Sequence, residues 1–140
     1  MKGRALAASA AIVALAAGAP AFSKGSQSGV YAAAQADEGA RVYATQCAMC
    51  HGARLEGTVE TPGLVGKFVA NWAGRPLGDL FDYLGRAMPQ GSPGRLDPQD
   101  NARLVAFILR ANGAPAGDAA LPADAAALRR ITFDPADPGS

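Results

Sequence analysis

Cys47-Ala48-Met49-Cys50-His51 contains both cysteines and the single histidine of the 140-residue chain. In a helical turn, residues three and four positions apart are neighbours, with Cβ atoms roughly 5–6 Å from each other. The thiols of Cys47 and Cys50 and the imidazole of His51 therefore share one face of a short segment. Because the chain has no other cysteine or histidine, we expect these three side chains to act together on one ligand.

The order C-x-x-C-H is typical of the attachment site of a c-type haem. In such a site the two thiols form thioethers with the porphyrin, and the imidazole binds the iron. Three other uses of these residues stay open. A thioredoxin-like redox pair normally follows a strand, a structural zinc site takes four protein ligands, and a structural disulfide would leave His51 without a role. We predict one haem c, held covalently by Cys47 and Cys50, with His51 on its iron.

Residues 1–21 have the pattern of a secretory signal peptide. Lys2 and Arg4 precede an alanine-rich apolar run, and Ala19-Pro20-Ala21 offers small residues to a signal peptidase. The run is shorter than the ~20 residues that a transmembrane helix needs. We predict export to the periplasm and no membrane span in the mature protein. A retained N-terminal anchor and cleavage at Ala34-Gln35-Ala36 are the alternatives.

Export agrees with the attachment motif, because thiols rarely stay free in an oxidising compartment and thioethers would use both of them. Removal of Lys2 and Arg4 reduces the 13 basic residues to 11, against 12 acidic ones, so the formal net charge changes from +1 to −1. The sequence has no basic block for nucleic acid, and its charge does not identify a partner.

Three helices separated by glycine- and proline-rich loops are expected. Apolar side chains recur at helical spacing, Asp97 is a good N-cap before Pro98, and Asn112-Gly113 ends the last helix. The expected helices span residues 31–47, 76–87 and 98–111, with a short helical turn at 66–71. We expect no strand. The predicted organisation is a signal peptide (1–21), a flexible segment (22–30), a haem domain (31–113) and a packed C-terminal extension (114–140).

A haem iron held by His51 has one further axial position, for which proteins use His, Met, Cys, Tyr or no residue. No second histidine exists, Met1 would leave with the signal peptide, and Met49 lies inside the attachment segment. Met88 remains. Pro89 disfavours helical geometry at the residue before it, so Met88 is expected on a loop directly after a helix. We predict His51 and Met88 as the iron ligands, with a vacant or tyrosine-ligated position as the alternative.

The chain resembles a bacterial class I c-type cytochrome over residues 39–113. The resemblance rests on Gly39-x-x-x-Tyr43-x-x-x-Cys47-x-x-Cys50-His51-Gly52, Pro62-Gly63-Leu64, Met88-Pro89 with Pro93-Gly94, and an aromatic residue in the last helix. It implies an all-α, small cytochrome c fold, in which three main helices and Gly/Pro-rich loops wrap around one covalently attached haem. It also implies that the first and last helices cross where Gly39 meets Phe107.

The resemblance implies roles for four further residues. In the family, a proline carbonyl after the motif accepts a hydrogen bond from the ligand histidine, and Pro62 is the matching residue. Leu64 would pack against the haem. Trp72 and Arg75 lie where the family often places donors to a haem propionate. On their own, such residues are more often a core side chain and a solvated charge.

A closed His/Met site indicates a one-electron carrier rather than an enzyme, because it leaves no position for a substrate. The redox partners would be a dehydrogenase, an oxidase or another cytochrome. The sequence from Tyr43 to Leu121-Pro122 is also similar to cytochromes that accompany quinoprotein alcohol dehydrogenases. A haem-bearing subunit permanently docked to such a dehydrogenase through the tail, or a five-coordinate haem enzyme or sensor, are the alternatives to a monomeric carrier. The chain lacks the lysine ring of mitochondrial cytochrome c.

Overall fold

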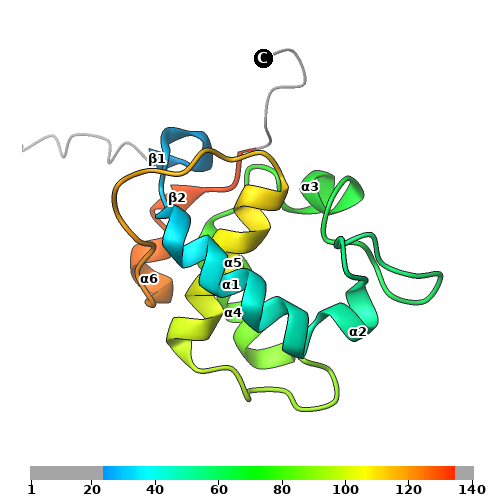
Figure 1. The fold of residues 1–140 in the computed structure, drawn as a ribbon. Helices are drawn as coiled ribbons and strands as arrows, with labels where there is room; N and C mark the ends of the chain where they lie inside the picture. Colours follow the sequence, from blue (N-terminus) through cyan, green and yellow to red (C-terminus); the bar gives the residue numbers. More distant parts are fainter. Residues whose placement is uncertain (1–23, 135–140) are drawn as a thin grey trace, which may run out of the picture.

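About half of the described residues are helical, and the helices surround one apolar core (Figure 1). The computed structural model describes residues 24–134. The three longest helices are α1 (Ala33–Gln46), α4 (Leu77–Ala87) and α5 (Pro98–Ala111). The short elements are β1 (Lys24–Gly25), the 3-10 helix η1 (Ser26–Ser28), α2 (Ala48–His51), α3 (Lys67–Trp72), α6 (Ala125–Leu128) and β2 (Ile131–Thr132). The all-α fold with three main helices, predicted from the sequence, is confirmed.

Helices α1 and α5 cross in close contact at Gly39. A Cβ atom built on Gly39 would clash with the carbonyl group of Arg103, 2.6 Å from its carbon atom, and would lie 2.9 Å from Cβ of Phe107. Glycine is therefore required at this crossing, because any side chain would push the two helix backbones apart. The crossing of Gly39 with Phe107 that the resemblance implied is confirmed.

Helix α4 follows the expected apolar spacing. Its buried residues are Leu77, Gly78, Leu80, Phe81 and Leu84. The helix ends at Ala87, and the next residue, Met88, has a φ of −123° and a ψ of 151°, which are extended, as expected for a residue that precedes proline. Helix α5 begins with Asp97, whose side chain accepts a hydrogen bond of 2.8 Å from the backbone N–H of Asp100.

Two short strands were not expected. Strand β1 pairs in parallel with β2, with Lys24 opposite Ile131 and Gly25 opposite Thr132. Ser26 is fully buried, and its hydroxyl donates a 3.0 Å hydrogen bond to the carbonyl oxygen of Asp134. Residues 24–30, expected to be flexible, are therefore packed. Composition cannot reveal this, because the partner strand lies more than a hundred residues away.

The predicted signal peptide, residues 1–21, lies outside the described residues, as do residues 22 and 23 and residues 135–140. Within residues 24–134, no helix has both the length and the apolar character needed to cross a membrane.

Candidate functional site

The attachment segment forms one helical turn directly after α1. The N–H of Cys47 donates to the carbonyl oxygen of Tyr43 at 2.9 Å, which ends α1, and the N–H of His51 donates to the carbonyl oxygen of Cys47 at 2.9 Å. This turn, α2, gives Cys47, Cys50 and His51 their helical spacing. The two cysteines are not joined by a disulfide; Cys50 is exposed and Cys47 is half-buried.

The Cys47 thiol is a weaker acid than an ordinary cysteine, because its pKa is raised. Burial, and to a smaller extent the neighbouring Cys50, raise the pKa of Cys47 to about 11. The thiol is therefore protonated at neutral pH, whereas the reactive cysteine of a redox pair has a lowered pKa. Among residues 24–134, no group of three or more His, Cys, Asp or Glu side chains is arranged to hold a metal ion, and Cys47, Cys50 and His51 form none.

His51 is held in a fixed orientation by the loop that follows it. Its side chain is buried, and Nδ1 lies 2.8 Å from the carbonyl oxygen of Pro62. A carbonyl oxygen only accepts hydrogen bonds, so Nδ1 carries the proton and Nε2 keeps its lone pair for a metal. The loop is closed by backbone bonds from Gly57 to His51 at 2.7 Å and from Leu64 to Leu55 at 2.8 Å.

Among the described residues, Met88 is the methionine that packs against the core. Its side chain is partly buried against the apolar cluster, whereas that of Met49 is 96% exposed. The N–H of Met88 donates to the carbonyl oxygen of Leu84 at 3.0 Å, which ties the residue to the last turn of α4. Leu64 is buried in the same apolar cluster and follows Pro62 in the loop that holds His51.

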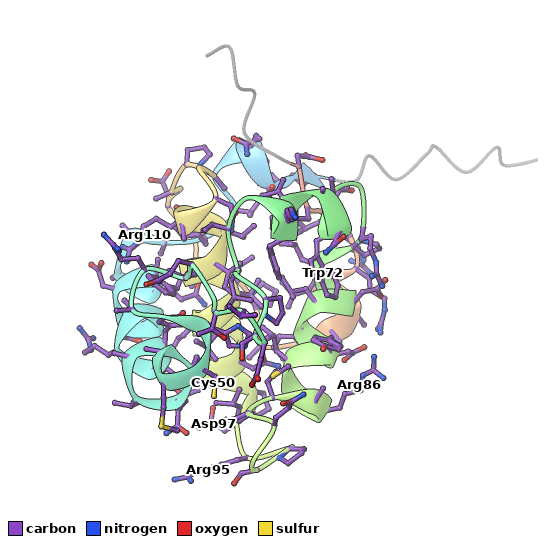
Figure 2. The ribbon with its side chains drawn as sticks, turned by 90° about the vertical axis from the view of Figure 1, so that its right-hand side faces the viewer. Cys50, Trp72, Arg86, Arg95, Asp97 and Arg110 are labelled. Carbon is purple, nitrogen blue, oxygen red and sulfur yellow. The ribbon has the colours of Figure 1, made fainter. Side chains whose placement is uncertain are left out.

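Trp72 is the last residue of α3, and Arg75 follows it three residues later. Figure 2 shows Trp72 on the side of the molecule that also carries Cys50. The guanidinium carbon of Arg75 lies 4.4 Å from the centre of the indole ring, a cation–π distance. The ring also packs against Phe68 and Tyr83, at centroid distances of 6.0 Å and 5.9 Å. Arg75 and Asp79 form a long ion pair of 3.6 Å.

Two hydrogen-bond donors near the site, Tyr43 and Asn112, were not predicted from the sequence. The phenol of Tyr43 donates a 2.6 Å hydrogen bond to the carbonyl oxygen of Gly52, and burial, with smaller contributions from Cys47 and Glu56, raises its pKa to about 12. The side chain of Asn112 donates to the carbonyl oxygen of Leu64 at 2.9 Å. No local pattern could have shown these bonds, because their partners are set by how the loops pack on α1 and α5.

A groove of about 770 Å³ runs along α4. Its lining residues are Trp72, Arg75, Asp79, Phe81, Asp82, Tyr83, Gly85, Arg86, Leu96, Pro98, Asn101 and Arg129. None of Cys47, His51 and Met88 lines this groove, so we do not assign it to the haem. It borders the candidate site at Trp72 and Arg75.

The residues present fit a covalently attached haem. Two free thiols lie one helical turn apart, the adjacent imidazole presents Nε2, and a thioether sulfur from Met88 is held against the apolar cluster. Soft sulfur and imidazole nitrogen are the donors that haem iron takes in c-type cytochromes.

Comparison with known proteins gave one finding. Neither the curated proteins nor the solved structures show a significant match. Residues 34–108 match the family model described as cytochrome c oxidase, cbb3-type, subunit III. Because this match spans more than half of the chain and includes Cys47, His51 and Met88, the chain belongs to this family of c-type cytochrome domains, which are haem-based electron carriers.

Proposed function

We propose that this protein is a periplasmic monohaem c-type cytochrome that passes single electrons from a dehydrogenase or membrane complex to a terminal acceptor. The observation that carries the proposal is the 2.8 Å hydrogen bond between Nδ1 of His51 and the carbonyl oxygen of Pro62. A histidine that directs its other nitrogen at a metal needs such a partner to fix its tautomer and orientation. In this proposal Cys47 and Cys50 form the thioethers, and His51 and Met88 bind the iron.

The haem iron supplies the one-electron exchange between its ferric and ferrous states. The chain supplies fixed surroundings for that exchange. Pro62 keeps the imidazole of His51 in one orientation, and Met88 would supply a second iron ligand, which would leave no position for substrates and small ligands. Burial of the surrounding apolar side chains keeps water away, so both oxidation states meet nearly the same environment. Little rearrangement then accompanies each transfer.

Three further residues complete the proposed site. Leu64, buried in the apolar cluster, would pack against the porphyrin. The indole N–H of Trp72 has no hydrogen-bond partner among residues 24–134 and is available to a propionate. Arg75, held over the indole ring at 4.4 Å, would add a positive charge beside the same carboxylates.

Export is part of the proposal. The predicted signal peptide over residues 1–21 would deliver the chain to the compartment where c-type haems are used, and cleavage would leave the mature protein at a formal net charge of −1 before haem is counted. The mass of the purified protein tests this directly. We expect a chain that begins at Phe22 and carries one haem, whereas a full-length chain would contradict the predicted cleavage.

A visible spectrum tests the proposed iron ligands. The oxidised protein should show the Met–iron charge-transfer band at the red end of its spectrum. Met88→Ala should lose this band and gain carbon monoxide binding, because the substitution opens the sixth position. Met49→Ala is the matched control, since the side chain of Met49 is 96% exposed and lies outside the core. Wild-type protein that binds carbon monoxide readily would instead support a five-coordinate enzyme or sensor.

A permanently docked subunit is the second candidate function. The matched family is described as subunit III of an oxidase, which favours a fixed place in a membrane complex over free diffusion. The sequence similarity to cytochromes of quinoprotein alcohol dehydrogenases points to a different complex. Purification from the native periplasm and membranes separates these outcomes. A monomer in the soluble fraction supports the carrier, and stoichiometric co-purification with an oxidase or a dehydrogenase supports the subunit.

A further inference from the structure

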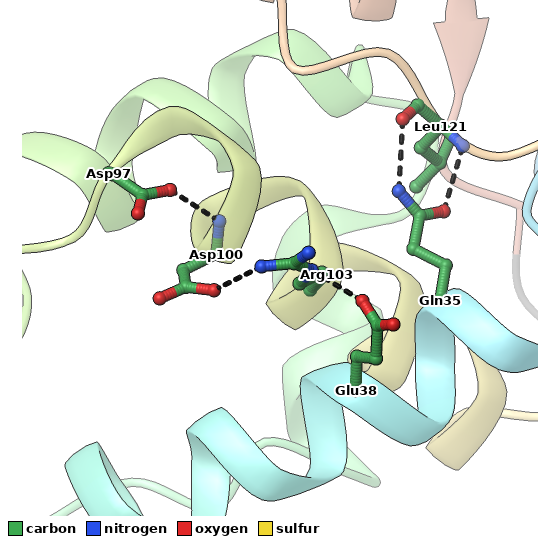
Figure 3. Close-up of polar contacts among 6 residues, drawn as sticks. All are labelled: Gln35, Glu38, Asp97, Asp100, Arg103 and Leu121. Atoms are coloured by element: carbon green, nitrogen blue, oxygen red, sulfur yellow. Dashed lines mark hydrogen bonds and ion pairs between the residues drawn. The ribbon is translucent and has the colours of Figure 1, made fainter.

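The C-terminal extension is packed on the fold as a strap, defined here as residues 114–134. The phenol of Tyr31 donates to the carbonyl oxygen of Ala114 at 2.7 Å in a buried contact. The side-chain amide of Gln35 forms two hydrogen bonds with the backbone of Leu121, of 2.9 Å and 2.8 Å (Figure 3). Leu121, Leu128 and Phe133 are almost fully buried. The strap therefore has its own fixed path along the helices.

The end of the strap reaches the loop that carries Trp72 and Arg75. The carbonyl oxygen of Phe133 accepts from the N–H of Gly74 at 2.9 Å, and the N–H of Phe133 donates to the carbonyl oxygen of Arg75 at 2.8 Å. The ring of Phe133 packs edge-on against Phe68 at 6.1 Å, and Phe68 in turn packs against Trp72. Phe133 thus contacts this loop through its backbone, and its ring contacts Phe68 of α3, which supports Trp72.

Arg129, also on the strap, shares the carboxylate of Asp79 with Arg75. Its guanidinium pairs closely with Asp82 and lies 3.6 Å from Asp79, which is also the partner of Arg75 at 3.6 Å. Arg75 and Arg129 together therefore pair with Asp79 and Asp82, and the two positive charges balance the two negative charges. Without Arg129, both carboxylates would act on Arg75 and draw its guanidinium toward α4.

Glycine at the start of α4 makes this placement of Arg129 possible. A Cβ atom on Gly78 would lie 2.9 Å from the backbone nitrogen of Arg129 and would clash with the carbonyl oxygen of Ala125. Any larger residue at position 78 would therefore push α6 off α4. Figure 1 shows α6 and β2 on the side of the helices opposite α2, so the strap lies away from the attachment segment itself.

We propose that Phe133 and Arg129 are positioning residues for the haem site. Phe133 holds the loop of residues 72–76, and Arg129 occupies Asp79 and Asp82 so that Arg75 stays available beside Trp72. The proposal rests on the proposed function, in which Trp72 and Arg75 face the haem carboxylates. It assigns the extension an internal role, in contrast to a tail that serves as the contact with a dehydrogenase.

The reduction potential tests the role of Arg129. Arg129→Gln should lower the reduction potential. The site would lose a positive charge, and this loss favours the ferric state. Arg130→Gln is the matched control, since it removes the same charge from an exposed neighbour without a side-chain contact to Asp79 or Asp82. Equal potentials in the two variants would refute the proposal.

Hydrogen exchange tests the role of Phe133. Phe133→Ala should accelerate exchange of the Gly74 amide and shift the reduction potential, with Phe133→Leu as a milder variant if the alanine protein does not fold. Leu121→Ala is the matched control, because Leu121 is a buried strap residue that does not contact the loop. If Leu121→Ala changes both readouts as much as Phe133→Ala does, the strap stabilises the fold only and the proposal fails. Failure of the proposed function is distinct, because the wild type would then lack the Met–iron band.

Discussion

The imidazole of His51 and the carbonyl group of Pro62, eleven residues apart, are joined by a hydrogen bond of 2.8 Å. This bond places the proton on Nδ1 and leaves Nε2 for iron. It also adds electron density to the imidazole, which favours the ferric state of a bound iron. In the proposed site, the strength of this one backbone contact would therefore contribute to the reduction potential.

We expect Pro62→Gly to raise the reduction potential. The carbonyl oxygen remains, but glycine frees the loop backbone and weakens the bond to His51. A loss of about 1 kcal/mol that falls on the ferric state alone corresponds to a shift of roughly 40 mV for one electron. A redox titration measures the shift, with Pro115→Gly as a control at an exposed position outside the site. A potential equal to that of wild type would show that the loop holds the carbonyl group without proline.

Gly39→Ala should destabilise the protein by about 1–2 kcal/mol. The added methyl group would clash with the backbone of Arg103, and overpacking costs more than the roughly 1 kcal/mol that alanine gains in a helix. Gly85→Ala is the control, because a Cβ there would meet only the side-chain amide of Asn101, at 3.1 Å. Urea unfolding measures both. Equal effects at the two positions would contradict a special role for the α1–α5 crossing.

Tyr43→Phe should cost about 1–2 kcal/mol at neutral pH, because the buried carbonyl oxygen of Gly52 loses its donor. The variant should also change how stability depends on pH. The folded-state pKa of about 12 lies above the value of 10.0 for a free tyrosine. The stabilisation from the raised pKa is therefore fully present below pH ~10 and is lost as the pH rises toward ~12, by up to about 2.7 kcal/mol.

Unfolding of wild type and Tyr43→Phe between neutral and strongly alkaline pH measures this difference. The wild type should lose more stability than the variant above pH ~10, because only the wild type has this phenol to ionise on unfolding. Tyr83→Phe is the control, since Tyr83 is 37% exposed. Parallel profiles for wild type and Tyr43→Phe would contradict the raised pKa.

Gln35→Ala should destabilise the fold by about 1–3 kcal/mol, because the N–H and C=O of Leu121 both lose their partner. The haem spectrum should stay unchanged, since the hydrogen bonds of Gln35 go to Leu121 and not to the proposed iron ligands. Thermal unfolding followed by circular dichroism measures the loss. Gln99→Ala, at an exposed position in the first turn of α5, should have an effect close to zero. A similar loss in both variants would argue against the anchor.

Local sequence patterns predicted those elements whose structure is determined by residues only a few positions away. Helix α5 spans Pro98–Ala111, as expected, because Asp97 caps it and Pro98 fits its first position. Met88 is extended because the next residue is proline. The attachment motif predicted the haem family in the same way, because its three side chains need only one helical turn.

Contacts between distant residues could not be predicted in this way. Strand β1 has no strand-like sequence, and its two residues pair only because β2 passes beside them. The bonds of Phe133 to Gly74 and Arg75 likewise depend on the path of the strap. Nothing in the composition of residues 114–134 indicates which loop the strap will reach.

The sequence by itself determined the family and the three main helices and predicted the attachment residues, because these depend on motif order, capping and helical spacing over short distances. Only the tertiary structure decided where residues 24–30 and 114–134 pack, and how Arg75 and Arg129 share Asp79. These contacts join groups that meet only after the helices have packed around the core, so their energies depend on the whole fold.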